Sequence, residues 1–153
     1  MTRRLIGALA IITTLLLSGC GNDYGVDQYG QKVAAQRLDK QWLVVNYWAE
    51  WCGPCRTEIP ELNALAEQLK GQNVGVFGVN FDNVQGAELK EASDKLGIKF
   101  TVLAQNPEEI FDIPRSEALP VTYIIDDKGK VREQMMGEQT AEGVIAKLKA
   151  LRG

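Results

Sequence analysis

The feature that most constrains this chain is a pair of cysteines, Cys52 and Cys55, with only Gly53 and Pro54 between them. The pair follows a strongly apolar run at residues 42–48, typical of a buried strand, and precedes a segment with helical spacing of apolar residues. The unpaired amides and the positive dipole end of a helix would stabilise an anionic sulfur at Cys52. Pro54 suits a first helical turn because it lacks an amide hydrogen. The placement predicts a reactive dithiol, with Cys55 near enough to attack a mixed disulfide at Cys52.

Other uses of the two cysteines fit the composition less well. The chain has three cysteines and no histidine, so it lacks the four ligands that a structural zinc site needs. A c-type haem attachment needs a histidine after the second cysteine, where this chain has Arg56. An inert structural disulfide and a carrier that binds metal through two thiolates remain as alternatives. We expect no metal and no cofactor.

The bulk composition is that of one ordinary globular domain. Of the 153 residues, 45% are hydrophobic and 24% are charged. The formal net charge is −3, and it becomes −5 once Arg3 and Arg4 are left out. Nucleic-acid binding requires a basic face, so we expect no nucleic-acid partner.

The N-terminal segment has the pattern of an export signal. A basic start is followed by an apolar run at residues 5–17 and by Leu-Ser-Gly-Cys at residues 17–20. Thirteen helical residues reach roughly 20 Å, too short for a hydrocarbon core of about 30 Å. We therefore expect a signal peptide at residues 1–19, with a transmembrane anchor as the alternative.

The residues around Cys20 resemble the lipobox of bacterial lipoproteins. This resemblance implies cleavage before Cys20 and lipid attachment to it, followed by a lipidated tether at residues 20–28. The protein would then be extracytoplasmic, anchored to a bacterial membrane and facing the periplasm, with the inner and outer membranes both open. An ordinary secreted protein with an unmodified Cys20 is the alternative.

Hydrophobic periodicity and turn residues predict an α/β domain at residues 29–153, with a mixed central sheet flanked by helices. Tyr29 to Val33 could form an N-terminal β-hairpin. Asp127, Lys128 and Gly129 join the last two strands, which should be antiparallel. The expected strands are residues 42–48, 74–81, 100–103, 121–126 and 130–136, and the expected helices are residues 55–69, 85–96, a turn at 107–111 and a last helix capped by Thr140.

Two segments resemble the thioredoxin family. Residues 47–56, Tyr-Trp-Ala-Glu-Trp-Cys-Gly-Pro-Cys-Arg, resemble its active-site segment, and residues 118–126 resemble the segment that carries its cis-proline. The resemblance implies a thioredoxin-like fold in which Pro120 is cis and faces a redox disulfide between Cys52 and Cys55. The backbone of Leu119 would then pair with an extended substrate.

The remaining residues of that surface are also substrate-binding candidates. Trp51 and Leu119 would form an apolar collar around Cys52, and Gly53 and Pro54 would contact substrate between the two cysteines. From the residues alone, Trp51 and Leu119 could equally serve packing, and Pro120 could simply begin a strand.

Three positions distinguish this chain from cytoplasmic thioredoxins. Asn46 stands where those proteins carry a buried aspartate, and Gly78 where they carry a lysine. Glu58, three residues after Cys55, instead matches the TlpA/ResA branch of membrane-tethered thioredoxins. Helical spacing puts Glu58 on the face of Cys55, where burial would raise its pKa and let it exchange a proton with Cys55. A solvated surface glutamate is the alternative.

The resemblance to the TlpA/ResA branch implies an extracytoplasmic thiol:disulfide oxidoreductase. We expect it to reduce protein disulfides as a monomer and to receive electrons from an integral-membrane thiol donor, with cytochrome c maturation among the roles of the branch. The Gly-Pro dipeptide between the cysteines favours a low reduction potential of about −270 mV, as in thioredoxin. A disulfide-forming oxidase is the first alternative, and a thiolate metal carrier is the second.

Overall fold

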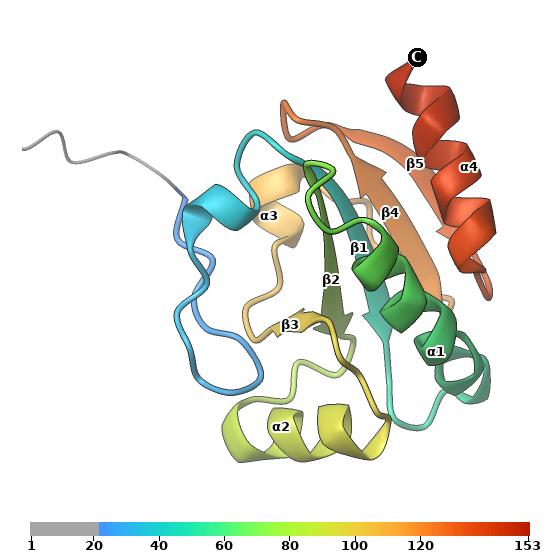
Figure 1. Ribbon diagram of the computed structural model, residues 1–153. Coiled ribbons are helices and arrows are strands. Elements are labelled where there is room, and N and C mark those ends of the chain that lie inside the picture. The colour runs from blue at the N-terminus through green and yellow to red at the C-terminus, as the bar shows by residue number, and fades with distance from the viewer. Residues whose placement is uncertain (1–21) are drawn as a thin grey trace, which may run out of the picture.

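The computed structural model describes residues 22–153. The expected signal peptide at residues 1–19 and the expected lipidation site Cys20 lie outside these residues. The described chain forms one five-stranded sheet in the order β3-β2-β1-β4-β5, with helices on both faces (Figure 1). The α/β class and the mixed sheet predicted from the sequence are confirmed.

The sheet combines a parallel and an antiparallel half. Strand β1 pairs in parallel with β2, which pairs in parallel with β3. On its other side β1 pairs antiparallel with β4, which forms an antiparallel hairpin with β5. The strands are β1 (Trp42–Trp48), β2 (Val74–Asn80), β3 (Thr101–Leu103), β4 (Val121–Ile125) and β5 (Val131–Met136).

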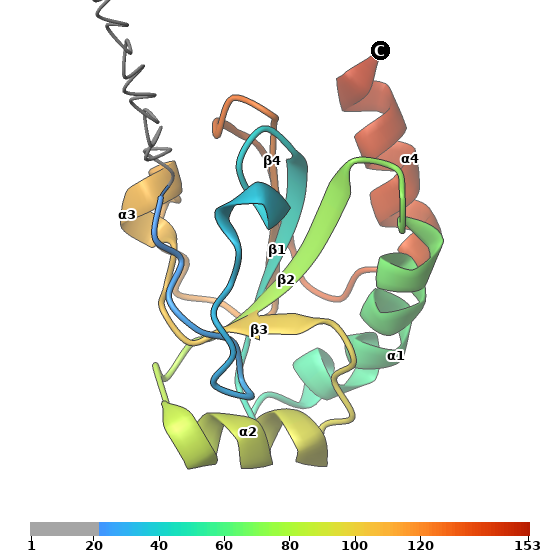
Figure 2. The ribbon, with the colours of Figure 1, turned by 60° about the vertical axis from the view of Figure 1, so that its left-hand side comes forward.

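Every residue of β1 is buried, because this central strand is covered on both faces. Its side chains alternate between two hydrophobic clusters. Val44 and Trp48 belong to a cluster with residues of α1, α2 and α4, here called the α1-side core. Val45 and Tyr47 belong to a cluster with α3 and the N-terminal segment, here called the α3-side core. Figure 2 shows α1 and α4 on one face of the sheet, with α3 and the N-terminal segment on the other.

The helices are η1 (Ala35–Arg37), α1 (Gly53–Gln68), α2 (Gly86–Lys95), α3 (Glu108–Phe111) and α4 (Ala141–Arg152). Helix α1 begins two residues earlier than expected, because Cys52 is its N-cap and Pro54 lies in its first turn. It continues through Pro60. Thr140 caps α4 as predicted, accepting a hydrogen bond from the Gly143 amide.

The N-terminal segment differs from the tether expected up to residue 28. Tyr24 is buried, stacks on Phe111 and donates a 2.7 Å hydrogen bond to Asp39. The buried Gln28 side chain accepts from the Val102 amide and donates to the Phe100 carbonyl, so it completes hydrogen bonding at β3. The folded domain therefore begins before residue 29, and the predicted boundary needs this correction.

The predicted N-terminal hairpin is present, but it is shorter than a regular pair of strands. Val26 and Lys32 form an isolated antiparallel bridge, and the Gly30 amide donates to the Asp27 carbonyl within the turn. Asp27 also bridges to Leu103, which attaches the turn to the edge of the sheet. Within residues 22–153, no helix has the length and apolar character required to cross a membrane.

Candidate active site

The two cysteines form a disulfide at the start of α1, directly after the loop that leaves β1. Their Cα atoms are 5.3 Å apart. Cys52 is 4% exposed and Cys55 is fully buried, so the outer sulfur is the one that a substrate can reach. The Cys55 amide donates to the Cys52 sulfur over 3.2 Å. That amide and the helix dipole favour negative charge on Cys52 when the pair is reduced.

Trp51 projects from the protein beside this pair. Its side chain is 65% exposed, and its indole N–H donates a 2.8 Å hydrogen bond to Asp82. The carboxylates of Glu50, Asp82 and Glu88 and the guanidinium of Arg56 line a shallow hollow next to it. A large aromatic residue this exposed beside a reactive sulfur is placed to contact a partner rather than the core.

The peptide bond between Leu119 and Pro120 is cis, as the family resemblance implied. Pro120 is buried, and its carbonyl accepts from the Gly137 amide over 2.9 Å. The half-buried Leu119 packs against the α1-side core, which contains both cysteines. Leu119 therefore packs against the same hydrophobic core as the cysteine pair, although the two are far apart in the sequence.

Glu58 is buried, with an exposed fraction of 1%, and this decides between the two interpretations of that residue. Its Oε1 accepts a 2.7 Å hydrogen bond from the Asn46 side-chain amide, and its Oε2 accepts a 3.0 Å bond from the Gln139 backbone amide. Loss of water raises the Glu58 pKa to about 7, while these two donors oppose the rise and the nearby Glu138 charge adds to it. The carboxyl group can therefore gain or lose a proton near neutral pH.

The Asn46 amide joins two elements behind the disulfide. Besides Glu58 on α1, its nitrogen contacts the hydroxyl oxygen of Thr122 on β4 over 3.0 Å. Its oxygen Oδ1 is buried and has no hydrogen-bond partner among the described residues. Leaving a buried acceptor without a partner is unfavourable. The two hydrogen bonds that the amide nitrogen donates offset part of this cost and hold the side chain in place.

Gly78 lies where a lysine would crowd two aromatic rings. A Cβ atom at this position would lie 2.9 Å from the Phe100 ring and 3.0 Å from the Trp48 ring nitrogen. The space taken by a side chain in cytoplasmic thioredoxins is thus filled here by the α1-side core. Glu58, from the neighbouring helix, is the buried carboxyl group that reaches Asn46 instead.

The described residues around the two sulfurs do not form a metal site with three or more ligands. Among residues 22–153, no group of three or more cysteine, aspartate or glutamate side chains is placed to hold a metal ion. The chain contributes no histidine to such a group.

Comparison with known proteins places this arrangement in a family. The sequence profile of the AhpC/TSA family matches residues 16–134. This chain belongs to the AhpC/TSA family. The chain is also similar to the thiol-disulfide oxidoreductase ResA of Bacillus thuringiensis (strain Al Hakam). The two are 32% identical over 125 residues, which cover 82% of this chain and 72% of ResA.

Two further proteins support the same relationship. The thioredoxin-like protein YneN of Bacillus subtilis (strain 168) is 28% identical over 78% of this chain and 70% of YneN. A thiol:disulfide interchange protein of the thioredoxin family from Chlorobium tepidum TLS superposes with a TM-score of 0.69 and 25% identity, covering 84% of this chain and 92% of that one. The thioredoxin-like fold and the oxidoreductase class predicted from the sequence are confirmed.

Sequence reasoning did not find every residue of the site. Thr122 and the backbone amide of Gln139 contact the Asn46–Glu58 pair, but neither stood out in the sequence. A backbone donor leaves no side-chain signal, and Thr122 lies 76 positions from Asn46. The occurrence of a threonine within the apolar β4 strand was the one available hint.

Proposed function

We propose that this protein is an extracytoplasmic reductase of protein disulfides that works through Cys52 and Cys55. The observation that carries the proposal is the disulfide at the start of α1 with the buried Glu58 carboxyl group three residues further along the same helix. A thiolate at Cys52 supplies the nucleophile, and a group titrating near neutrality supplies the proton acceptor for Cys55.

The reaction begins with the reduced pair. The Cys52 thiolate attacks one sulfur of a substrate disulfide, a mixed disulfide forms, and the first substrate sulfur leaves as a thiolate. Ionised Glu58 takes the proton of the Cys55 thiol, and the Cys55 thiolate attacks the Cys52 sulfur. The second substrate thiolate leaves, so the substrate gains two electrons and the enzyme ends with its Cys52–Cys55 disulfide.

The substrate chain is proposed to lie beside Leu119 and Pro120, with Trp51 on the other side of the Cys52 sulfur. Gly53 and Pro54 lie between the cysteines in the first turn of α1 and add little side-chain bulk there. An extended polypeptide can hydrogen-bond to the backbone before Pro120 as an added strand does.

Each turnover leaves the pair oxidised, so a donor of two electrons has to restore it. Extracytoplasmic compartments are oxidising. An integral-membrane thiol protein is the proposed donor, and disulfides of apocytochrome c are among the proposed substrates. We propose that the protein acts as a monomer held to the periplasmic face of a membrane by lipid on Cys20.

The anchor has its own test. The full-length chain is expressed in a bacterium with its signal segment, and the membrane and soluble fractions are compared for the natural protein and Cys20→Ala. The proposal expects lipid on Cys20 of the natural protein by mass spectrometry, and no lipid on the variant. A natural protein that carries no lipid on Cys20 would refute the lipid anchor without affecting the redox proposal.

The catalytic proposal is tested by trapping in cells with Cys55→Ser, which stops the reaction at the mixed disulfide. Covalent adducts through Cys52 are expected, and they should disappear in the double variant Cys52→Ser/Cys55→Ser. The direction follows from the purified protein: a reductase reduces insulin disulfides with dithiothreitol as donor. Formation of disulfides in a reduced test protein without reduction of insulin would favour the oxidase instead.

A further inference from the structure

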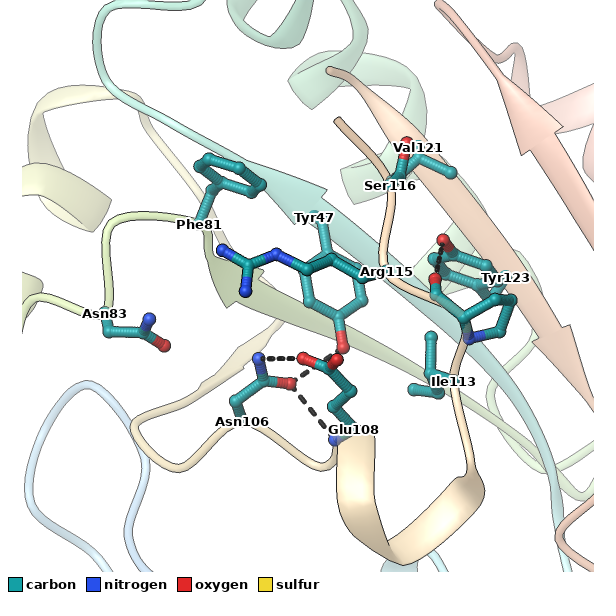
Figure 3. Close-up of a pocket in the computed structure, with 11 residues that line it drawn as sticks. Tyr47, Phe81, Asn83, Asn106, Glu108, Ile113, Arg115, Ser116, Val121 and Tyr123 are labelled. Atoms are coloured by element: carbon teal, nitrogen blue, oxygen red, sulfur yellow. Dashed lines mark hydrogen bonds between the residues drawn. The ribbon is translucent and has the colours of Figure 1, made fainter. Parts of the chain in front are cut away.

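A small cavity lies on the face of β1 opposite Glu58 (Figure 3). Its volume is about 80 Å³. Tyr47 and Val121, which are paired neighbours on β1 and β4, line it from the sheet. Phe81, the first residue after β2, lines it from one side, and Pro114, Arg115 and Ser116 line it from the segment that leads to β4. Tyr47 belongs to the α3-side core, so this cavity is separate from the Asn46–Glu58 contact.

The cavity lies at the end of β1 from which the active-site loop leaves. The Phe81 amide donates a 2.8 Å hydrogen bond to the carbonyl of Trp48, the last residue of β1 before the active-site loop. The Phe81 and Leu119 side chains both pack against the α1-side core, which contains Cys52 and Cys55. Phe81 therefore lines the cavity and also packs against the hydrophobic core that includes the cysteine pair.

The lining combines six aromatic or aliphatic residues with five polar ones, and the pairing of its polar groups favours an uncharged occupant. The hydroxyl of Tyr47 already donates to Asn106, and the hydroxyl of Tyr123 already donates to the Pro114 carbonyl. These groups therefore offer their rings to the cavity and have no need of a polar ligand. Glu108 and Arg115 both line it, so their opposite charges select neither an anion nor a cation.

The size sets a narrower limit. For comparison, an apolar cavity of about 150 Å³ binds benzene. A cavity of about 80 Å³ has room for an aliphatic side chain but not for an aromatic ring or a cofactor. Arg115 and Pro114 are exposed at this site, so the cavity can be reached from the surface.

We propose that this cavity is a specificity pocket for one aliphatic side chain, of the size of valine, leucine or methionine, on the polypeptide whose disulfide is reduced. The inference rests on the proposed function. A substrate chain that brings its cysteine to Cys52 along Leu119 passes the segment at residues 114–118 within a few residues, since an extended chain advances about 3.3 Å per residue. The guest residue then enters beside Phe81.

The experiment uses the reduced protein and a set of peptides, each carrying one cysteine in a mixed disulfide with glutathione. All other positions are alanine except one leucine, which is moved from three residues before the cysteine to three residues after it. At one offset leucine should raise kcat/KM about tenfold over the all-alanine peptide, as expected for filling a small apolar pocket. Tryptophan at that offset should give no such gain.

Variants then locate the effect. Ile113→Phe should fill the cavity and bring the leucine-to-alanine ratio of kcat/KM close to one, and Ile113→Ala should enlarge it and let tryptophan gain instead. Val131→Phe adds the same ring to the α3-side core at the far end of β4 and β5, and it should leave the ratio unchanged. Because each ratio is measured on one preparation, a general loss of activity in a variant cancels.

Hydroxyethyl disulfide, which has no side chain to place in the cavity, distinguishes a failure of the pocket from a failure of the proposed reductase activity. If the natural protein reduces it but shows the same rate with every peptide, the pocket is refuted and the reductase stands. A leucine preference that persists in both Ile113 variants also refutes the pocket. If neither hydroxyethyl disulfide nor any peptide is reduced, the proposed function fails and the pocket with it.

Discussion

The side-chain amide of Asn46 donates a 2.7 Å hydrogen bond to Glu58 in a part of the core where both side chains are almost completely buried. Cytoplasmic thioredoxins place their buried carboxyl group on the strand, whereas this chain places it on the helix and keeps an amide on the strand. Burial favours the neutral acid, and the two donated hydrogen bonds favour the ionised one. The balance between them fixes the pH range in which Glu58 can accept a proton from Cys55.

Glu58 should make the stability of the oxidised protein depend on pH. Its pKa is raised from an ordinary 4.5 to about 7 in the folded state. Between these pH values the folded protein keeps a proton that the unfolded chain has released, so the free energy of unfolding should fall as the pH rises through this window. A shift of this size corresponds to about 3 kcal/mol. Urea unfolding at pH 4.5, 6 and 8 gives the free energy of unfolding of the natural protein and of Glu58→Gln. The change with pH in the difference between these two free energies measures the contribution of Glu58.

The natural protein should lose this stability relative to Glu58→Gln on going from pH 4.5 to pH 8. Glu91→Gln, which removes an exposed carboxylate on α2, controls for the loss of one negative charge. A difference between the natural protein and Glu58→Gln that is constant with pH would contradict the burial of a titrating carboxyl group.

Replacing Asn46 should move the titration of Glu58 upward. Asn46→Leu keeps the approximate volume but removes the side-chain donor that stabilises the ionised carboxylate. We expect the pKa of Glu58 to rise above 7 and the variant to lose about 2 kcal/mol of stability at pH 8, with a smaller loss at pH 5. Carbon-13 NMR of the labelled glutamate carboxyl group measures the pKa, and urea unfolding measures the stability.

Thr122→Val is the matched control for that experiment. It removes the second contact of the Asn46 amide and leaves the Asn46–Glu58 hydrogen bond in place. The Glu58 pKa should then change far less than in Asn46→Leu. An equal change in both variants would mean that packing around the strand, rather than the donated hydrogen bond, governs the proton affinity.

A methyl group at Gly78 should destabilise the protein. In Gly78→Ala the new Cβ atom would lie 2.9 Å from the Phe100 ring and 3.0 Å from the Trp48 ring nitrogen, both in the closely packed core. Such overpacking costs about 1–3 kcal/mol. In Gly53→Ala the added atom meets nothing within 4 Å, so stability should be unchanged or slightly increased. Thermal and urea unfolding of both variants test the contrast, which a neutral Gly78→Ala would contradict.

Trp51 should matter for protein substrates more than for stability. Because its side chain is 65% exposed, Trp51→Ala should change the free energy of unfolding by less than about 1 kcal/mol. Reduction of insulin should slow about tenfold, whereas reduction of hydroxyethyl disulfide should change little. Asp82→Asn keeps an acceptor for the indole N–H and should behave like the natural protein. Equal slowing with both disulfides would assign Trp51 to the chemistry at Cys52 instead of substrate contact.

Much of the sheet could be predicted because the local pattern and the tertiary environment agree. The apolar run at residues 42–48 is β1 to the residue, since a strand covered on both faces needs no polar positions. The helix predicted at residues 55–69 begins two residues too late, because Cys52 caps α1 and Gly53 is its first residue. The short η1 turn has no apolar periodicity and could not be predicted.

Some residues of the candidate site could be predicted from the sequence, whereas the contacts around them could not. The cysteine pair, the cis bond before Pro120 and the burial of Glu58 each had a sequence signal, either a motif or helical spacing. The contacts that tune Glu58 come from β1, β4 and a backbone amide before α4, which only the folded chain brings together. The cavity beside Phe81 has no sequence signal either, because loops without a repeating pattern supply much of its lining.

The attachment of Tyr24 to Asp39 and Phe111 limits how far the domain could stand from the lipid that we propose on Cys20. Only four peptide units separate the two residues, a span of at most about 14 Å when fully extended. A domain held so closely would sample a thin layer above the bilayer surface rather than the depth of the periplasm. Its electron donor and its substrates would have to expose their sulfur atoms within that layer, and soluble proteins would have to come to the membrane to be reduced.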